Sequence, residues 1–297
     1  MRPVLFLVAA VAYAQTPPDP TMVLDQARAK IATAMKRLPK YACVQTIDRS
    51  YYASPKSRPG ETSCDQMSAD RKNGQKSLRL EKTDRLRLDV AQGLETEIHS
   101  RPGASRFDLT ELHQIVDSGP FGTGSFGGYL VDIFDNDGTQ YDYEGQRTTG
   151  NRSVYVYGYA VAQSVSHYEI EDGASWFTTA YSGTFEVDPE TFEIGRLTVH
   201  TSELPVETHI CHADSTMDYQ RVEIGDGSFL LPGRTRLQLM LRDGQETDNT
   251  TVYTSCREFH AESAVSFSAP SPAAAKAAEG APNSGRNCRA DWRWNSA

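Results

Sequence analysis

The longest alternation of apolar and polar positions in the chain runs from Ser175 to Thr201 and predicts a β-hairpin. Its first strand reads WFTTAYSGTFEVD, its turn PET and its second strand FEIGRLTVHT. Because side chains of a strand point alternately to its two faces, one face of the first strand receives the large apolar side chains. These are Phe177, Tyr181, Phe185 and Val187. A long strand with one apolar and one polar face is typical of an antiparallel sheet that is covered on one side.

Alternating segments elsewhere predict that most of the remaining chain forms strands. They are Tyr41–Tyr52, Ser77–Glu81, Arg85–Ala91, Leu94–Ser100, Tyr141–Gly145, Arg152–Ala160, Ser164–Ile170, Glu207–Ala213, Thr216–Ile224, Phe229–Leu231, Arg234–Arg242 and Thr247–Phe259. Turn signals such as Asp243-Gly244 separate neighbouring segments. About ten strands at this spacing predict a mainly β (α+β) fold, a curved antiparallel sheet or half-barrel.

One segment near the N-terminus, Thr21–Leu38, has helical periodicity. Asp19 is a suitable N-cap, Pro20 suits the first helical position, and Pro39 ends the pattern. The apolar residues form one stripe: Val23, Leu24, Ala27, Ile31, Ala34, Met35 and Leu38. We expect this helix to pack on the concave face of the sheet. A helix lying on a membrane surface is the alternative, but Asp25 interrupts its basic face.

The two ends of the chain predict export and a disordered tail. Arg2 and the apolar run Val4–Val11, followed by small residues up to Ala14, have the pattern of a secretory signal peptide. An N-terminal membrane anchor is the alternative, although the run is shorter than the roughly 20 apolar residues that span a bilayer. The expected division is a signal peptide at 1–14, a single β-rich half-barrel domain at 15–267 and a disordered Ala/Pro/Ser/Gly-rich tail at 268–297. The expected location is the periplasm or the extracellular space, after cleavage near Ala14.

The net charge limits which partners the protein can bind, and the cysteine content indicates the compartment in which it works. The formal net charge is −9 and no basic cluster is present, so we expect neither nucleic acid nor an anionic membrane as a partner. Five cysteines in an exported chain indicate disulfides. Of the three connectivities that four cysteines allow, we favour Cys43–Cys256 and Cys64–Cys211, which leaves Cys288 alone in the tail.

Two short motifs suggest a nucleotide or a calcium site. Gly122, Gly124 and Gly127 spell G-x-G-x-x-G, but a dinucleotide site needs that motif between a buried parallel strand and a helix. A polar segment precedes it here, so we expect a glycine-rich loop. The sequence DNDG at 135–138 resembles part of a calcium loop, but the first ligand position is occupied by Ile133. We expect an ordinary turn there.

Three residues close in sequence, His209, Cys211 and His212, are the best candidate metal ligands. In a strand His209 and Cys211 share a face while His212 points away, so one ion could reach only two of them. A disulfide at Cys211 would remove the site. Because the chain also lacks the G-x-S-x-G and H-E-x-x-H motifs, we expect no catalytic residues, no metal and no cofactor.

Segments throughout the chain resemble a family of exported acidobacterial proteins of unknown function. They are Leu38–Arg49, Asp84–Ala91, Arg101–Phe107, Ser182–Leu197, Phe229–Leu237 and Cys256–Ser263. An N-terminal helix, a long meander and a G-x-F-x-V-D-x-x-T hairpin are also similar, at the level of the fold, to periplasmic lipoprotein carriers of the LolA, RseB and LppX type. The first resemblance implies no activity, whereas the second implies a half-barrel with a ligand on its concave side.

The carrier resemblance implies a ligand site lined by Phe177, Tyr181, Phe185, Leu237 and Leu239. A concave apolar surface suits an acyl chain or a lipidated peptide, so we expect a non-catalytic binding or carrier protein for a lipid or a lipidated protein. The alternative is an envelope structural or protein-interaction module without a small-molecule ligand. Such a module would use a sheet edge or an exposed row formed by Tyr155, Tyr157 and Tyr159.

Overall fold

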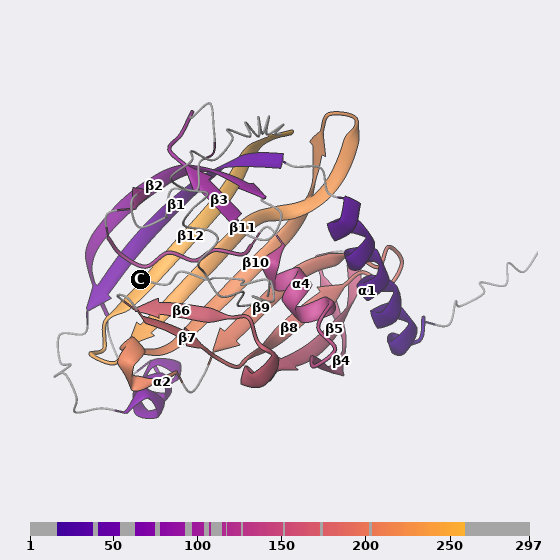
Figure 1. The fold of residues 1–297 in the computed structure, drawn as a ribbon. Helices are drawn as coiled ribbons and strands as arrows, with labels where there is room; N and C mark the ends of the chain where they lie inside the picture. The colour runs from indigo at the N-terminus through magenta and orange to yellow at the C-terminus, as the bar shows by residue number, and fades with distance from the viewer. Residues whose placement is uncertain are drawn as a thin grey trace, which may run out of the picture.

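In the computed structural model the described part of the chain consists mostly of strands (Figure 1). The described residues are 17–37, 41–53, 63–74, 78–92, 97–103, 107, 115–116, 118–125, 127–150, 152–172, 175–201 and 204–258. The predicted signal peptide at 1–14 and the predicted tail at 268–297 both lie outside the described residues.

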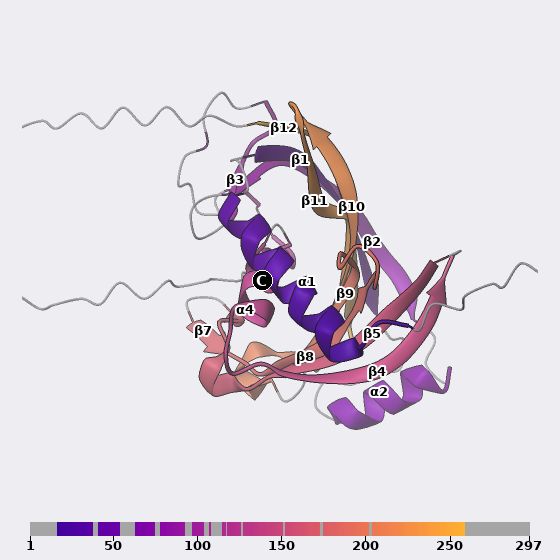
Figure 2. The same ribbon diagram turned by 90° about the vertical axis from the view of Figure 1, so that its right-hand side faces the viewer.

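A ten-stranded antiparallel sheet forms the body of the described structure, in the order β3-β2-β1-β12-β11-β10-β9-β8-β5-β4. Its strands are β1 (Tyr41–Ala53), β2 (Arg79–Gln92), β3 (Glu97–Ser100), β4 (Gln140–Thr149), β5 (Arg152–Val161), β8 (Tyr181–Val187), β9 (Ile194–Thr201), β10 (Ile210–Ile224), β11 (Gly227–Leu241) and β12 (Glu246–Glu258). The sheet curves strongly but is not closed into a barrel, since β3 and β4 form its two edges (Figure 2). The predicted curved antiparallel sheet is therefore confirmed.

Helix α1 (Pro20–Arg37) lies across the concave side of the sheet, as predicted (Figure 2). The Oδ1 atom of Asp19 caps it by accepting hydrogen bonds from the backbone N–H groups of Thr21, at 2.8 Å, and Met22, at 3.2 Å. The part of its apolar stripe that is buried consists of Val23, Ala27 and Ile31. Neither α1 nor any other helix in the described ranges is long and apolar enough to cross a membrane.

The single long strand predicted from Ser175 to Val187 is wrong, because the chain changes sheets in its middle. The first part, β7 (Ser175–Thr178), pairs with β6 (Glu169–Asp172) in a separate two-stranded ribbon. Only β8 joins the large sheet. Between them Thr179 is buried and donates its backbone N–H to the carbonyl of Tyr168 at 3.0 Å. Side chains keep alternating through such a bend, so the periodicity does not reveal that the hydrogen-bonding partner changes.

Both predicted disulfides are confirmed. Cys43–Cys256 joins the neighbouring strands β1 and β12, and Cys64–Cys211 joins helix α2 (Cys64–Lys72) to β10. The second bond is important for α2, because Met67 is the buried residue of this nine-residue helix. Burying one methionine contributes about 1.5–3 kcal/mol, whereas ordering each residue of the backbone costs roughly 1–2 kcal/mol. The disulfide, more than packing, therefore holds α2 against the sheet.

Gly183 in β8 allows a close approach of two backbones. A Cβ atom added there would collide with the carbonyl group of Thr198 on β9 and would lie 2.9 Å from the hydroxyl of Tyr159. We expect Gly183→Ala to lower the free energy of unfolding in urea by about 1–3 kcal/mol through overpacking. Gly195→Ala on β9 is the matched control, since nothing lies within 4 Å of its added Cβ. Equal unfolding midpoints for the two variants would contradict the predicted collision.

Candidate functional site

The strand register gathers aromatic side chains on the half of the concave face that β4, β5, β8 and β9 form. Tyr157 lies opposite Phe185, which in turn lies opposite Leu197. The rings of Tyr157 and Phe185 stack at 5.2 Å, and Phe134 from helix α4 (Gly128–Phe134) meets Phe185 edge-on at 4.9 Å. We define the aromatic cluster as Tyr129, Phe134, Tyr141, Tyr157, Tyr159, Tyr168, Tyr181 and Phe185.

Helices α1 and α4 lie on the concave side of the sheet (Figure 2), and Val23, Ala27 and Ile31 of α1 belong to the same buried cluster as these aromatic residues. The hydroxyls of Tyr155 and Tyr157 donate to two carbonyls at the start of α1, those of Pro18 at 2.7 Å and Pro20 at 2.8 Å. Further along the helix, the Lys30 ammonium and the Glu193 carboxylate form an ion pair at 2.8 Å. Helix α1 is thus attached by a short apolar stripe and a few polar contacts, and neither disulfide involves it.

The row Tyr155, Tyr157 and Tyr159 is buried, so the expectation of an exposed tyrosine row is wrong. These side chains face the concave side and are 2%, 1% and 4% exposed. Alternation in VYVYGYA correctly places the three on one face of the strand. It does not show which face is covered, because the covering helix comes from a distant part of the chain.

A buried carboxylate, that of Asp132 on α4, connects the aromatic cluster to the loop before β6. It accepts a hydrogen bond from the Tyr181 hydroxyl at 2.5 Å and lies 2.6 Å from Nδ1 of His167. Burial raises the pKa of Tyr181 and the Asp132 charge raises it further, so the phenol stays protonated and donates. Sequence reasoning missed Asp132. The signal that marks it is a carboxylate inside the apolar stretch YLVDIF.

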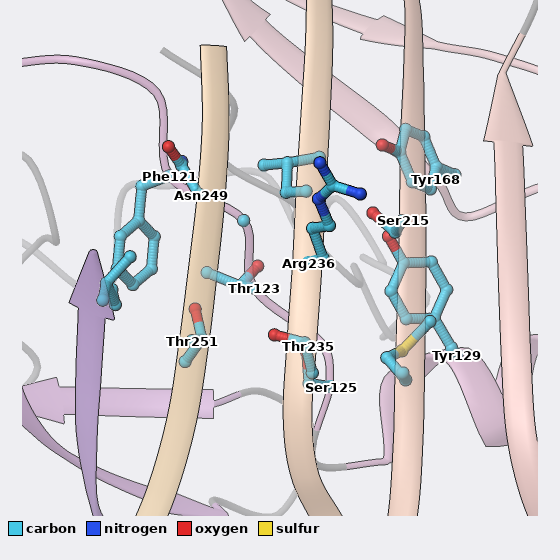
Figure 3. Close-up of a pocket in the computed structure, with 14 residues that line it drawn as sticks. Phe121, Thr123, Ser125, Tyr129, Tyr168, Ser215, Thr235, Arg236, Asn249 and Thr251 are labelled. Carbon is cyan, nitrogen blue, oxygen red and sulfur yellow. The ribbon is translucent and has the colours of Figure 1, made fainter. Parts of the chain in front are cut away.

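The centre of the concave face is polar and nearly filled. Strands β10, β11 and β12 face the loop 118–125 across a cavity of about 30 Å³ (Figure 3). One buried water needs roughly 10–15 Å³ of such space, so the cavity has room for about two waters and not for an acyl chain. Its lining includes the small polar side chains Thr123, Ser125, Ser215, Thr235, Asn249 and Thr251, together with Tyr129, Tyr168 and Arg236. The Asn249 amide nitrogen donates to the carbonyl of Pro120 at 2.8 Å, which ties the loop to β12.

Arg49 on β1 also fixes this loop to the sheet. Its side chain is 3% exposed and contacts both carboxylate oxygens of Asp84, at 2.6 and 3.0 Å, while Nη1 donates to the carbonyl of Ser118 at 2.7 Å. Burial alone raises the pKa of Asp84, but hydrogen bonds from Arg49 and Lys82, together with their positive charges, bring it below its ordinary value. Sequence reasoning missed this pair, whose signal is a charge at a core-facing position of an alternating strand.

The structure brings together only some of the five residues predicted to line a ligand site. Tyr181 and Phe185 both belong to the aromatic cluster, where the ring of Tyr159 lies 6.1 Å from the first and 6.2 Å from the second, and both are buried. Leu237 and Leu239 share the concave-facing side of β11, where Leu237 lines the small cavity and Leu239 is buried. Phe177 is half-buried and belongs to the separate ribbon of β6 and β7. With α1, α4 and the loop 118–125 in place, these side chains pack mainly against the protein itself.

The glycine motif and the DNDG motif lie in loops, and Cys211 of the candidate metal ligands forms a disulfide. The glycines of G-x-G-x-x-G precede α4, and among the residues that the structure describes no parallel strand leads into them. Asn136 accepts the backbone N–H of Gly138 at 2.9 Å in an ordinary turn. Cys211 is bonded to Cys64. Within the described ranges, no three His, Cys, Asp or Glu side chains are grouped so that they could hold a metal ion.

No protein-family model and no curated protein matches this sequence, whereas several solved structures are similar to its fold. A LolA superfamily protein from Nitrosomonas europaea is 11% identical, with a TM-score of 0.31 over 79% of this chain and 94% of that one. A DUF1329 family protein from Desulfovibrio piger is 8% identical, with a TM-score of 0.36 over 84% and 96%. A domain assigned to outer membrane lipoprotein sorting, from Vibrio parahaemolyticus, is 10% identical, with a TM-score of 0.33 over 79% and 92%. At these scores the likeness assigns neither a family nor a function.

Proposed function

We propose that this protein is an exported, non-catalytic binding or carrier protein for a lipid or another hydrophobic or lipidated ligand. The observation that supports this is the aromatic cluster on an open, curved sheet, beneath a helix that no disulfide ties down and that the chain joins to the sheet only at its C-terminal end, before β1. Each aromatic side chain can bury roughly 150–250 Å², and apolar burial contributes about 25 cal/mol per Å². A ligand that replaces the α1 stripe would bury the same rings and so offset the free energy lost when the helix moves away.

The polar contacts of α1 oppose this exchange. The two tyrosine hydrogen bonds, and those that Arg28 donates to the carbonyl of Phe134 and Lys30 to the carbonyl of Thr191, contribute about 0.5–1.5 kcal/mol each. An exposed ion pair such as Lys30–Glu193 contributes about 0–1 kcal/mol, so the ligand must bury enough apolar surface to offset several kcal/mol. Displacement of α1 would open a site over Tyr181 and Phe185. An extension of this site to Leu237 and Leu239 would also require the loop 118–125 to move, because Gly122 packs against Leu237. Phe177 would contribute from the neighbouring ribbon of β6 and β7. Two disulfides are in keeping with an oxidising compartment such as the periplasm.

Cross-linking α1 to the sheet tests this proposal. In a Cys288→Ser background, Lys30→Cys and Glu193→Cys are joined by a short bis-maleimide, at the position of an ion pair between α1 and the turn before β9. We expect the cross-linked mature protein to bind a fluorescent C16 fatty acid about tenfold more weakly than the same variant capped with N-ethylmaleimide, a difference of about 1.4 kcal/mol. Fluorescence titration measures both affinities.

The matched control places the same cross-link at Arg196→Cys and Asp218→Cys, an ion pair at 2.7 Å between β9 and β10 that does not involve α1. Its binding should equal that of the capped protein. Native mass spectrometry before and after organic extraction should also show a lipid mass that extraction removes. Absence of lipid together with undiminished dye binding in the Lys30–Glu193 cross-link would contradict the proposal. A reproducible protein partner without bound lipid would favour the interaction-module alternative instead.

A further inference from the structure

The convex face of the sheet carries a groove beneath helix α2 that is separate from the concave site. Strand pairing places His200 of β9 opposite Asp214 of β10, and Asp214 opposite Gln238 of β11. A second transverse row, two residues along, consists of His212, Met240 and Glu246. Ser215, Leu237 and Asn249, which line the concave cavity, lie between these two rows and the next residues along each strand. Because side chains alternate between the two faces of a sheet, both rows lie on its convex face. The groove between them and α2 has a volume of about 690 Å³, within the range of small-molecule sites.

The position of α2 is not explained by core formation. The helix has one buried apolar side chain, that of Met67, which packs against the disulfide and Met240. Its side toward the groove carries Asp65, Ser68, Arg71 and Lys72 next to the disulfide. Helix α2 is polar, and a disulfide holds it over polar side chains of the sheet. It therefore forms one wall of a site and does not cover a hydrophobic core.

Several charged groups of the groove have atoms without a partner among the described residues. Lys72 makes no hydrogen bond or ion pair with the described residues, and Arg242 donates Nη2 to the carbonyl of Leu204 at 2.9 Å while its buried Nε has no partner. On the other side, Glu246 pairs through Oε2 with Arg71, and its buried Oε1 is left without a hydrogen bond. Arg71 is paired with Glu246 and His200 with Asp214, so the cations Lys72 and Arg242 remain against the exposed carboxylate of Asp65 and the Oε1 atom of Glu246.

The two histidines of the floor differ in their readiness to carry a positive charge. Nδ1 of His200 lies 2.5 Å from Oδ1 of Asp214, and this hydrogen bond raises the pKa of His200 against the opposing effects of burial and of Lys72. Burial lowers the pKa of His212, and the charges of His200, Arg71 and Lys72 lower it further against the opposing effect of Asp214. The remaining charged groups that line the groove are Asp65, Arg242 and Glu246. The hydrogen bond to Asp214 uses Nδ1 of His200 and leaves Nε2 for a ligand.

We propose that this groove binds a small solute that carries a carboxylate or phosphate group and a hydroxyl. Lys72, Arg242 and His200 hold the anion, and the hydroxyl of the solute donates to Oε1 of Glu246. Asp214 does not repel the anion strongly, because its charge is paired with His200. Glycerate and glycerol 3-phosphate are the simplest probes with this combination. A phosphatidylglycerol head group presents the same chemistry.

Isothermal titration of the mature, disulfide-bonded protein at constant ionic strength tests the proposal. We expect saturable binding of glycerate and of glycerol 3-phosphate, and a loss of about tenfold or more in affinity for Lys72→Gln and for Arg242→Gln. Glycerate binding should strengthen as the pH falls from 8.5 to 6, because protonated His200 attracts the anion and the glycerate charge is constant over this range. His200→Gln should remove that pH dependence. Arg152→Gln, which removes an exposed cation on β5, is the control and should bind like the unaltered protein.

Sedimentation with phosphatidylcholine vesicles, with and without phosphatidylglycerol, separates the two sources of the anion. Binding of the free solutes without cosedimentation supports a solute site. Cosedimentation that requires phosphatidylglycerol and is lost in Lys72→Gln supports a site for the lipid head group. The proposal is overturned if neither probe binds saturably, or if folded Lys72→Gln, Arg242→Gln and His200→Gln all bind like the unaltered protein.

Discussion

Removal of the Cys43–Cys256 disulfide is expected to lower the free energy of unfolding by about 4 kcal/mol. The bond joins residues separated by 213 positions, but Cys64–Cys211 is nested within it and stays intact in the variant. In the unfolded state the loop that Cys43–Cys256 alone closes therefore consists of the stretches 43–64 and 211–256, about 65 residues, for which the loop-entropy relation gives roughly 4 kcal/mol. For a domain of this size such a loss corresponds to a fall in melting temperature of roughly 8–16 °C. Thermal and urea unfolding of the Cys43→Ala/Cys256→Ala variant measures the effect.

The remaining cysteines provide the controls. Cys288→Ser should leave the melting temperature unchanged, because both disulfides form without it. Cys64→Ala/Cys211→Ala should release α2, which hydrogen exchange detects as a loss of protection confined to residues 64–72. A Cys43→Ala/Cys256→Ala variant as stable as the unaltered protein would contradict the predicted role of the β1–β12 bond.

Replacement of Asp84 by asparagine is expected to cost about 3–5 kcal/mol of folding free energy, since it leaves the buried Arg49 cation without a counter-charge. Arg49 is 3% exposed and also holds the carbonyl of Ser118, so the loop 118–125 should lose hydrogen-exchange protection. Urea unfolding at pH 7 measures the loss. The double variant Arg49→Met/Asp84→Leu should recover most of it, because apolar side chains of similar volume often replace a buried pair at little cost.

The loss of folding free energy caused by Asp84→Asn should be smaller at acidic pH. The pKa of Asp84 is lower in the folded protein than in the unfolded chain, so its stabilisation is fully present above the unfolded value of about 3.9. It is lost as the pH falls through the folded value, and the difference between Asp84→Asn and the unaltered protein should shrink below about pH 4. Asp48→Asn is the matched control: Asp48 pairs with Arg85 on the exposed face, and its loss should cost about 0–1 kcal/mol. Equal costs for the two variants would contradict the assigned burial of Arg49.

Periodicity identified the sheet, helix α1 and its Asp19 cap, because each depends on residues close together in the sequence. It failed at Thr179, where the direction of the side chains continues but the partner strand changes. Phe177 was consequently placed on the large sheet, whereas it lies in the ribbon of β6 and β7. A pattern with a period of two reports which side chains share a face and does not report which strand comes next.

The candidate sites were less predictable than the fold for a related reason. Tyr155, Tyr157 and Tyr159 have the same alternation whether their face is open or covered, and only α1 on top of them decides between the two. Arg49 and Asp132 look like surface charges in the sequence. Their roles depend on Asp84, Ser118 and Tyr181, which strand pairing and loop closure bring to them.

Local spacing and composition are therefore enough to predict a curved antiparallel sheet, an amphipathic N-terminal helix and cysteines able to form two disulfides. Three features are visible only in the folded chain: the aromatic face is covered, the centre of the concave face is polar and nearly filled, and a second, charged groove lies beneath α2. These features arise from contacts over long separations, such as the 137 positions between Pro20 and Tyr157. Burial and charge pairing across such distances depend on the packed chain as a whole, which no local pattern encodes.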